Sequence, residues 1–210
     1  MKIEQMRLGR MRTFGYLIGD EVSGNAALID PAFDTADILH RANQSGYNIT
    51  HVLNTHHHAD HTAGNKAVIK VTGALLCIHA SDAPALSGLI NRATSRMLGG
   101  RRSPSPDRLL TDGDKLHVGT IELTILHTPG HTPGGICIHT PGHVFTGDTL
   151  FVGAIGRADL PGSSAEQLLA AIHRKLYTLP DETIVWPGHD YGDRPSSIVG
   201  HERQHNPYTR

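Results

Sequence analysis

Short apolar runs alternate along the chain with segments rich in glycine, proline and polar residues. Each apolar run is bounded by Gly, Pro, Asp or Asn, a pattern typical of β-strands rather than of long helices. The predicted strands are 14–18, 26–29, 51–54, 75–78, 121–126, 135–138, 143–145 and 183–186. They occur toward both ends of the chain, with helical segments between them.

The clearest predicted helix covers residues 165–179. Ser163 and Glu166 form a capping-box signature before it, and Pro180 ends it. Four apolar side chains fall on one helical face at i, i+1, i+4 and i+8: Leu168, Leu169, Ile172 and Leu176. This face predicts a helix that packs against a sheet.

Other helical segments are shorter, and one stretch reads as a loop. Residues 35–45 form a helix that Gly46 ends, and 81–98 contain one further helix. Residues 99–107 (Gly-Gly-Arg-Arg-Ser-Pro-Ser-Pro-Asp) predict an exposed loop. The whole pattern predicts an α+β fold, a four-layer αββα sandwich of two packed sheets with helices outside. It forms one domain, 1–210, with 190–210 as a C-terminal tail packed on it.

Composition narrows the class of protein. The chain has 210 residues, 38% hydrophobic and 19% charged, which indicates a soluble globular protein. A formal net charge of −1 gives no general attraction to nucleic acid. Cys77 and Cys137 lie in apolar runs and predict small buried side chains rather than disulfides. With no run of about 18 apolar residues and no signal-like N-terminus, we expect no membrane span and a cytoplasmic location. The oligomeric state is left open, a homodimer being one option.

The most informative feature of the composition is histidine, a common metal ligand, because the chain has 16 of them. Segment 54–64, Asn-Thr-His-His-His-Ala-Asp-His-Thr-Ala-Gly, follows a predicted strand and supplies four candidate ligands: His56, His58, Asp60 and His61. Histidine nitrogen and carboxylate oxygen are ligands of Zn²⁺-type ions. Alternate loop residues point the same way, so one loop can serve two ions about 3.5–4 Å apart. His57 alternates away, which predicts a supporting role.

Three further segments repeat one arrangement, a strand, a sharp glycine turn and a ligand-type residue. They end in His131, Asp148 and His189. Residues at strand ends beside glycine can project into a shared cleft. Together with segment 54–64, they predict a metal site in this cleft.

These seven residues resemble the pattern of the metallo-β-lactamase superfamily, T-H-x-H-x-D-H followed by a distant His, Asp and His. The resemblance extends from about residue 14 to residue 189. It implies the αββα sandwich, with the metal site at one edge of the two sheets, and a division of ligands. The first ion would be held by His56, His58 and His131, and the second by Asp60, His61 and His189. Asp148 would bridge both.

Within this superfamily, the chain is most similar to the glyoxalase II group, the hydroxyacylglutathione hydrolases. The matching stretches are 55–64, 128–135, 145–151, 156–162 and 196–208. The last two resemble the short bacterial branch. The longer enzymes carry a C-terminal helical domain that contacts glutathione, and those contacts cannot be transferred to this chain. Asp148 argues against the lactamases of the superfamily, which typically lack an Asp at that position. The net charge of −1 argues against its nucleases, which usually have basic surfaces.

The resemblance implies a chemistry and a substrate. A metal-bound hydroxide would attack the carbonyl of a small thioester, with Asp60 and Asp148 as the catalytic carboxylates. The cofactor would be two divalent ions, zinc or alternatively iron or manganese. The partner would be a small molecule, a glutathione conjugate or other thiol derivative. Arg157, Asp159 and Tyr191 are candidate substrate contacts, with an ion pair between Arg157 and Asp159 as the competing interpretation.

Three alternatives remain open. The persulfide dioxygenases are similar in length and keep the Gly-Arg-x-Asp element. By resemblance, they would use a single iron held by His56, His131 and Asp148, the two-histidine, one-carboxylate set that leaves positions open for O₂. Another small-ester or lactone hydrolase is the second alternative. A non-enzymatic metal-dependent binding module is the third, although open His/Asp ligation suits catalysis better.

Overall fold

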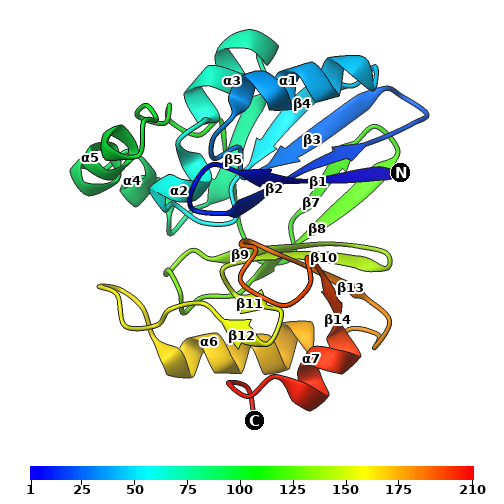
Figure 1. Ribbon diagram of the computed structural model, residues 1–210, viewed down its shortest axis with the longest axis vertical. Coiled ribbons are helices and arrows are strands. Elements are labelled where there is room, and N and C mark those ends of the chain that lie inside the picture. Colours follow the sequence, from blue (N-terminus) through cyan, green and yellow to red (C-terminus); the bar gives the residue numbers. More distant parts are fainter.

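The computed structural model describes residues 1–210 and consists of two six-stranded sheets packed face to face (Figure 1). The first sheet has the order β1-β2-β3-β4-β5-β6, and the second has the order β14-β13-β10-β9-β8-β7. The strands of the first sheet are β1 (Lys2–Leu8), β2 (Thr13–Gly19), β3 (Asn25–Ile29), β4 (Asn48–Leu53), β5 (Leu75–His79) and β6 (Arg108–Leu110). Those of the second are β7 (Lys115–Val118), β8 (Ile121–His127), β9 (Ile136–Thr140), β10 (His143–Gly147), β13 (Ile184–Pro187) and β14 (Ser197–Ile198).

Helices occupy the outer face of each sheet (Figure 1). In the first sheet, β3, β4, β5 and β6 run parallel, so their connections must cross over. Those connections carry α1 (Thr35–Gln44), α2 (Ala59–Thr62), α3 (Asn65–Thr72), α4 (Ala83–Leu86) and α5 (Leu89–Met97). The second sheet is covered by α6 (Ala165–Ala171), a π-helical turn η1 (Ile172–Leu176) and α7 (Val199–His205). A short hairpin, β11 (Leu150–Phe151) with β12 (Ala154–Ile155), precedes α6.

Three apolar layers hold these elements together. Tyr16 and Phe145 lie between the sheets, with ring centroids 5.0 Å apart. A second layer packs α1 and α3 against the first sheet, and a third packs α6 and η1 against the second. Leu168, Ile172 and Leu176 are fully buried in that third layer. The predicted four-layer αββα sandwich is therefore confirmed.

The predicted helix at 165–179 is correct in place but differs in detail. The α-helix ends at Ala171 and continues as a π-turn to Leu176. Its N-cap is Ser164, whose side chain accepts a hydrogen bond from the backbone N–H of Gln167 at 3.3 Å. The predicted capping residue, Ser163, donates instead to the His131 carbonyl at 2.9 Å. The helix is therefore capped one residue later than predicted, and the predicted cap, Ser163, instead contacts the loop that carries His131.

Other differences concern short elements. Segment 81–98 forms two helices, α4 and α5, rather than one. Segment 99–107 has no helix or strand; Arg101 and Arg102 are exposed, whereas Ser103 is buried and accepts a hydrogen bond from Asn65 at 2.9 Å. Cys77 and Cys137 are buried and unpaired, as predicted. None of the helices has the length and apolar character needed to cross a membrane.

Residues 190–210 contain β14 and α7. Strand β14 pairs with β13, and α7 places Glu202 in a fully buried position. One carboxylate oxygen of Glu202 accepts hydrogen bonds from the Gly153 N–H and the Asn206 side chain, both at 2.9 Å. The C-terminal helix is thereby fastened to the turn of the β11–β12 hairpin.

Candidate metal centre

All seven candidate ligands meet at one edge of the two sheets. Segment 56–61 follows β4, His131 follows β8, Asp148 follows β10 and His189 follows β13. Each lies just beyond the end of a buried strand, so rigid sheet positions fix where each loop begins. The isolated bridge between Thr13 and His189 joins the two sheets at this edge.

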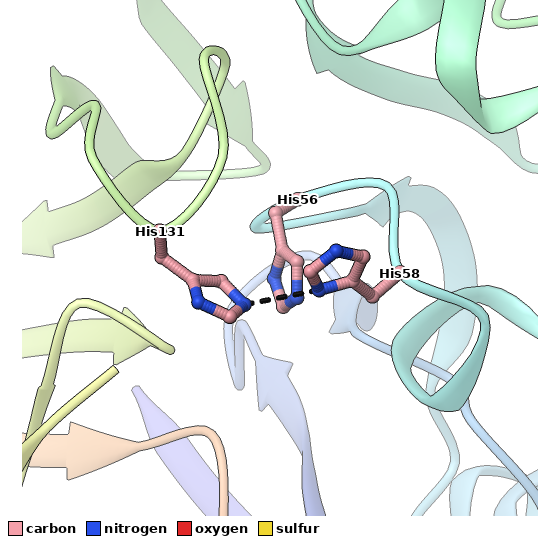
Figure 2. A group of neighbouring side chains, drawn as sticks. All are labelled: His56, His58 and His131. Atoms are coloured by element: carbon pink, nitrogen blue, oxygen red, sulfur yellow. Dashed lines mark hydrogen bonds between the residues drawn. The ribbon is translucent and has the colours of Figure 1, made fainter. Parts of the chain in front are cut away.

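The first cluster contains His56, His58 and His131. Their ligand atoms all lie within 4.8 Å of one another. Figure 2 shows the three rings converging from two separate loops, with Nε2 of His131 3.0 Å from Nδ1 of His58. His56 and His131 are buried, and His58 is half-buried. These three nitrogens can hold one ion.

The second cluster contains Asp60, His61 and His189, again with ligand atoms within 4.8 Å of one another. Nε2 of His61 lies 3.1 Å from Nε2 of His189. A carboxylate oxygen of Asp60 lies 3.5 Å from Nε2 of His189. Both histidines are buried, and this set can hold a second ion.

Asp148 lies between the two clusters. Its Oδ1 is 3.3 Å from Nε2 of His61 and 3.6 Å from Nε2 of His189. Its Oδ2 is 3.5 Å from Nε2 of His131. The two oxygens of one carboxylate therefore face two different groups of ligands, which is the position of a bridging residue.

The outward nitrogens of three rings fix their orientation. Nδ1 of His131 contacts the Arg157 carbonyl at 2.8 Å, and Nδ1 of His189 contacts the Met11 carbonyl at 3.1 Å. Nδ1 of His61 contacts Asp30 at 2.9 Å. Because a carbonyl or carboxylate only accepts, each Nδ1 must carry the proton. In the neutral rings, Nε2 then points a lone pair into the site. Two lone pairs 3.1 Å apart, on Nε2 of His61 and Nε2 of His189, repel each other unless a proton or a metal ion lies between them.

His56 completes this pattern through a relay. The Thr55 hydroxyl donates to Asp30 at 2.6 Å, which leaves its oxygen free to accept from Nδ1 of His56 at 3.1 Å. Nε2 of His56 is buried with no hydrogen-bond partner, and so is Oδ1 of Asp148. Buried polar atoms without partners are rare and costly in native proteins. The residues present thus fit a divalent metal ion at each cluster.

Electrostatics favour a positive charge at the centre. Burial opposes ionisation of His61, but the carboxylates of Asp148 and Asp30 outweigh it and raise the pKa of His61. Burial likewise disfavours the Asp148 anion, yet His61 and His189 lower the pKa of Asp148 below its usual range. At the other cluster, burial and the neighbouring His131 lower the pKa of His58 to about 4. His58 is therefore neutral and free to ligate at neutral pH.

Asp30 was not predicted, although it supports two of the candidate ligands. It is fully buried, has φ +47°, and also accepts the Thr55 backbone N–H at 2.9 Å. A carboxylate behind a ligating histidine fixes the ring and raises its basicity. The available signal was position: Asp30 directly follows β3, which pairs with the strand that leads to His56.

Asp82 is the second residue that the sequence did not indicate. It accepts hydrogen bonds from Nδ1 of His57 at 2.9 Å, from the Thr132 hydroxyl at 2.9 Å and from the Gly134 N–H at 2.7 Å. It therefore ties segment 54–64 to the loop of His131. His57, which points away from the two clusters, has the supporting contact expected of it.

The candidate substrate contacts divide into two kinds. Tyr191 lines the cavity of about 810 Å³ beside the centre, and its ring stacks on His189 with centroids 4.5 Å apart. Arg157 also lines this cavity, but its guanidinium pairs with Asp159 at 2.9 and 3.0 Å. Asp159 is not among the lining residues. The structure thus contains the ion pair between Arg157 and Asp159, and Arg157 stays a candidate substrate contact because it lines the cavity.

Two glycines let the backbone approach Asp148 closely. A Cβ at Gly188 would collide with Oδ1 of Asp148, and one at Gly156 would collide with the Asp148 carbonyl. The glycines noted in the sequence as turn residues thus also leave room for Asp148.

Comparison with known proteins identifies the class that this fold and centre define. The family model of the metallo-β-lactamase superfamily matches residues 8–189. The chain belongs to this superfamily, and its fold is the metallo-β-lactamase fold.

Two curated relatives carry different activities in their names. A hydroxyacylglutathione hydrolase from Polaromonas sp. (strain JS666) is 40% identical over 196 residues, 91% of this chain and 67% of the relative. The mitochondrial persulfide dioxygenase ETHE1 of Bos taurus is 34% identical over 208 residues, 98% of this chain and 74% of the relative. The chain is thus similar to enzymes of both kinds.

Two solved structures match nearly the whole fold. The crystal structure of the BLEG-1 B3 metallo-β-lactamase is 31% identical, covers 99% of each chain and has a TM-score of 0.90. The crystal structure of TTHA1623 in a di-iron-bound form is 32% identical, covers 98% of this chain and 99% of that one, and has a TM-score of 0.86. The second of these holds two metal ions in the same fold.

Proposed function

We propose that this chain is a metal-dependent hydrolase that cleaves a small thioester of the hydroxyacylglutathione type. The observation that carries the proposal is the position of Asp148, whose two oxygens face two separate ligand clusters. A single-ion enzyme does not need the second cluster. Similarity to the Polaromonas hydrolase supports the choice of a thioester.

The ligand roles follow from the two clusters. The first ion would be held by His56, His58 and His131, and the second by Asp60, His61 and His189. Asp148 would contact both. When bound, two such metal ions would lower the pKa of a coordinated water toward neutrality and polarise a carbonyl oxygen.

The chain's own residues then orient the reactants. Asp60 lines the cavity with its side chain 20% exposed, so it can accept a hydrogen bond from the attacking water. Tyr191 and Phe151 form a wall beside His189, with ring centroids 5.7 Å apart. A thiolate is a good leaving group, so cleavage requires no strong general acid.

Metal analysis combined with Asp148→Ala tests the proposal. We expect about two divalent ions per chain in the native protein and about one in the variant. Loss of the bridging carboxylate should lower kcat/KM for S-lactoylglutathione by a factor of about 100 or more, on the scale of removing one electrostatic stabiliser. The exposed Asp37→Ala serves as the matched control. Turnover near the native rate in Asp148→Ala would refute the bridging role.

Persulfide dioxygenation is the second candidate, because the bovine relative has that name and 98% of this chain matches it. In this case His56, His131 and Asp148 would hold one iron, a set that leaves positions open for O₂ and substrate. The protein would contain about one iron per chain and would consume O₂ in the presence of glutathione persulfide. Assays with a lactone and a β-lactam distinguish the remaining hydrolases. Two ions per chain without O₂ uptake would exclude the dioxygenase.

A further inference from the structure

Helix α5 has its polar side inward and its apolar side outward. Asn91 and Ser95 are buried, and Asn91 donates to the Leu86 carbonyl at 3.0 Å. Leu89 and Ile90 are 81% and 86% exposed. A surface helix ordinarily buries its apolar stripe, so this reversed arrangement marks a surface that contacts something apolar.

The first turn of α5 belongs to the same cavity as the candidate metal centre. Leu89 and Ile90 line the space of about 810 Å³ that Asp60, His131 and Asp148 also line. An apolar group held against this turn would therefore extend from a reacting bond at the centre. This continuity favours a substrate over a second protein chain as the occupant.

Further apolar lining of the cavity comes from other parts of the chain. Phe151 and Ile155 belong to the β11–β12 hairpin, Leu160 follows it, and Tyr191 follows β13. Met11, in the turn between β1 and β2, contributes a further apolar side chain. Apolar side chains from several separate elements thus line the cavity together with the centre, as in pockets that bind largely apolar ligands.

Charged recognition is weak in the same cavity. Arg157 is the only lysine or arginine among the lining residues, and Asp159 accepts two hydrogen bonds from its guanidinium. The walls offer hydrophobic contact instead.

We infer that the substrate carries an apolar aliphatic or aromatic group beyond the scissile bond, which packs between Leu89–Ile90 and the Phe151–Tyr191 wall. The inference rests on the proposed thioester hydrolase function and specifies its substrate class. Each buried methylene contributes about 0.8 kcal/mol, so kcat/KM rises roughly threefold to fourfold per methylene until the cavity is filled.

Two substrate series with the metal-loaded protein test this inference. The first lengthens the acyl group from acetyl to octanoyl on N-acetylcysteamine, and the second lengthens an alkyl thiol on a constant acetyl group. We expect the stated rise in at least one series, which also tells which half of the substrate is apolar. Flat values in both series would overturn the inference while leaving thioester hydrolysis intact. Absence of hydrolysis for every thioester, S-lactoylglutathione included, would instead refute the proposed function.

Variants of α5 separate the cavity wall from the rest of the helix. The double substitution Leu89→Ser with Ile90→Ser should reduce the chain-length dependence to about twofold per methylene or less. Met97→Ser is the matched control, because Met97 is 84% exposed on the same helix and does not line the cavity. An equal effect of both variants, accompanied by loss of a dimer in sedimentation, would assign this face to a second copy and contradict the inference.

A binding measurement provides a readout apart from turnover. Octanoate is titrated against the protein with anilinonaphthalene sulfonate as the fluorescent probe. We expect octanoate to displace the probe from the native protein and from Met97→Ser, with at least tenfold weaker probe binding in the double variant. Unchanged binding in the double variant would count against the apolar wall.

Discussion

Asp30 shows how one side chain behind the candidate ligands governs the centre. Its two oxygens contact Nδ1 of His61, the Thr55 hydroxyl and the Thr55 N–H, and Thr55 in turn contacts His56. One buried carboxylate therefore fixes the tautomer of a histidine in each cluster. The strained left-handed backbone at Asp30 places it there.

Replacing this carboxylate by an amide should weaken metal binding without removing a ligand. We expect Asp30→Asn to lower metal affinity roughly 10- to 100-fold, because the amide no longer accepts strongly from His61. Competition with a chromophoric chelator measures the affinity. The exposed Asp37→Asn is the control, and the thermal midpoint of the metal-free protein monitors folding. An unchanged affinity in Asp30→Asn would show that Asp30 is only a structural residue.

At the scale of single residues, the type of side chain was enough to predict the candidate ligands but not the residues that support them. The candidate ligands could be found because histidines and aspartates gather beside glycine turns. Asp30 and Asp82 could not, since an isolated aspartate after a strand resembles any turn residue. Their importance depends on contacts with His61 and His57, which are distant in sequence and become visible only in three dimensions.

Elements at the far end of the sandwich are joined by a single turn residue. Asp20 follows β2 and accepts hydrogen bonds from the Ser23 hydroxyl at 2.6 Å, and from the Thr120 N–H and hydroxyl at 2.8 and 2.9 Å. Thr120 lies in the turn between β7 and β8. Asp20 thus connects a hairpin of the first sheet to a hairpin of the second.

These hydrogen bonds make the contribution of Asp20 dependent on pH. The Ser23 hydroxyl and the Thr120 N–H lower the pKa of Asp20 well below its usual range. The stabilisation is therefore present above the unfolded-state pKa, about 3.9, and is lost as the pH falls toward the folded-state pKa. We expect metal-free Asp20→Asn to be less stable than the native chain in urea at pH 7, with a smaller difference at pH 3. An equal difference at both pH values would contradict this assignment.

Strands were predicted correctly where apolar residues follow one another without a break, and were missed where apolar and polar residues alternate over a short stretch. The buried strand β2 is apolar on both faces and was found. Edge strands such as β7, Lys115–Val118, alternate exposed and buried positions over too few residues to give a pattern. The change from α- to π-helix at Ile172 has no signal in the pattern of apolar residues.

The whole molecule depends on the metal centre because its ligands come from both sheets. Segment 56–61 extends from the first sheet, whereas His131, Asp148 and His189 extend from the second. Any ion bound there links the two halves of the sandwich. The layered fold itself could be predicted from the alternation of strands and helices, but the assignment of ligands to clusters required resemblance.

Removal of metal should therefore lower global stability. Free metal at 100 times its dissociation constant stabilises the folded state by about 2.7 kcal/mol. For a chain of this size, that corresponds to roughly 5–10 °C in thermal midpoint. Differential scanning with and without chelator measures the shift, and Asp148→Ala should show a smaller one. A chelator that strips the ions yet leaves the midpoint in place would argue against a link between the halves.

The strand orders have a consequence for biosynthesis. Residues 2–110 build the whole first sheet, and residues 115–198 build the second, so each sheet is contiguous in the chain. A nascent chain exposes four ligand-type side chains of segment 56–61 while their partners His131, Asp148 and His189 are still untranslated. The complete centre exists only after His189 has left the ribosome and the halves have docked. Because each cluster needs a side chain from the second sheet, we expect full loading with metal to follow the synthesis of His189.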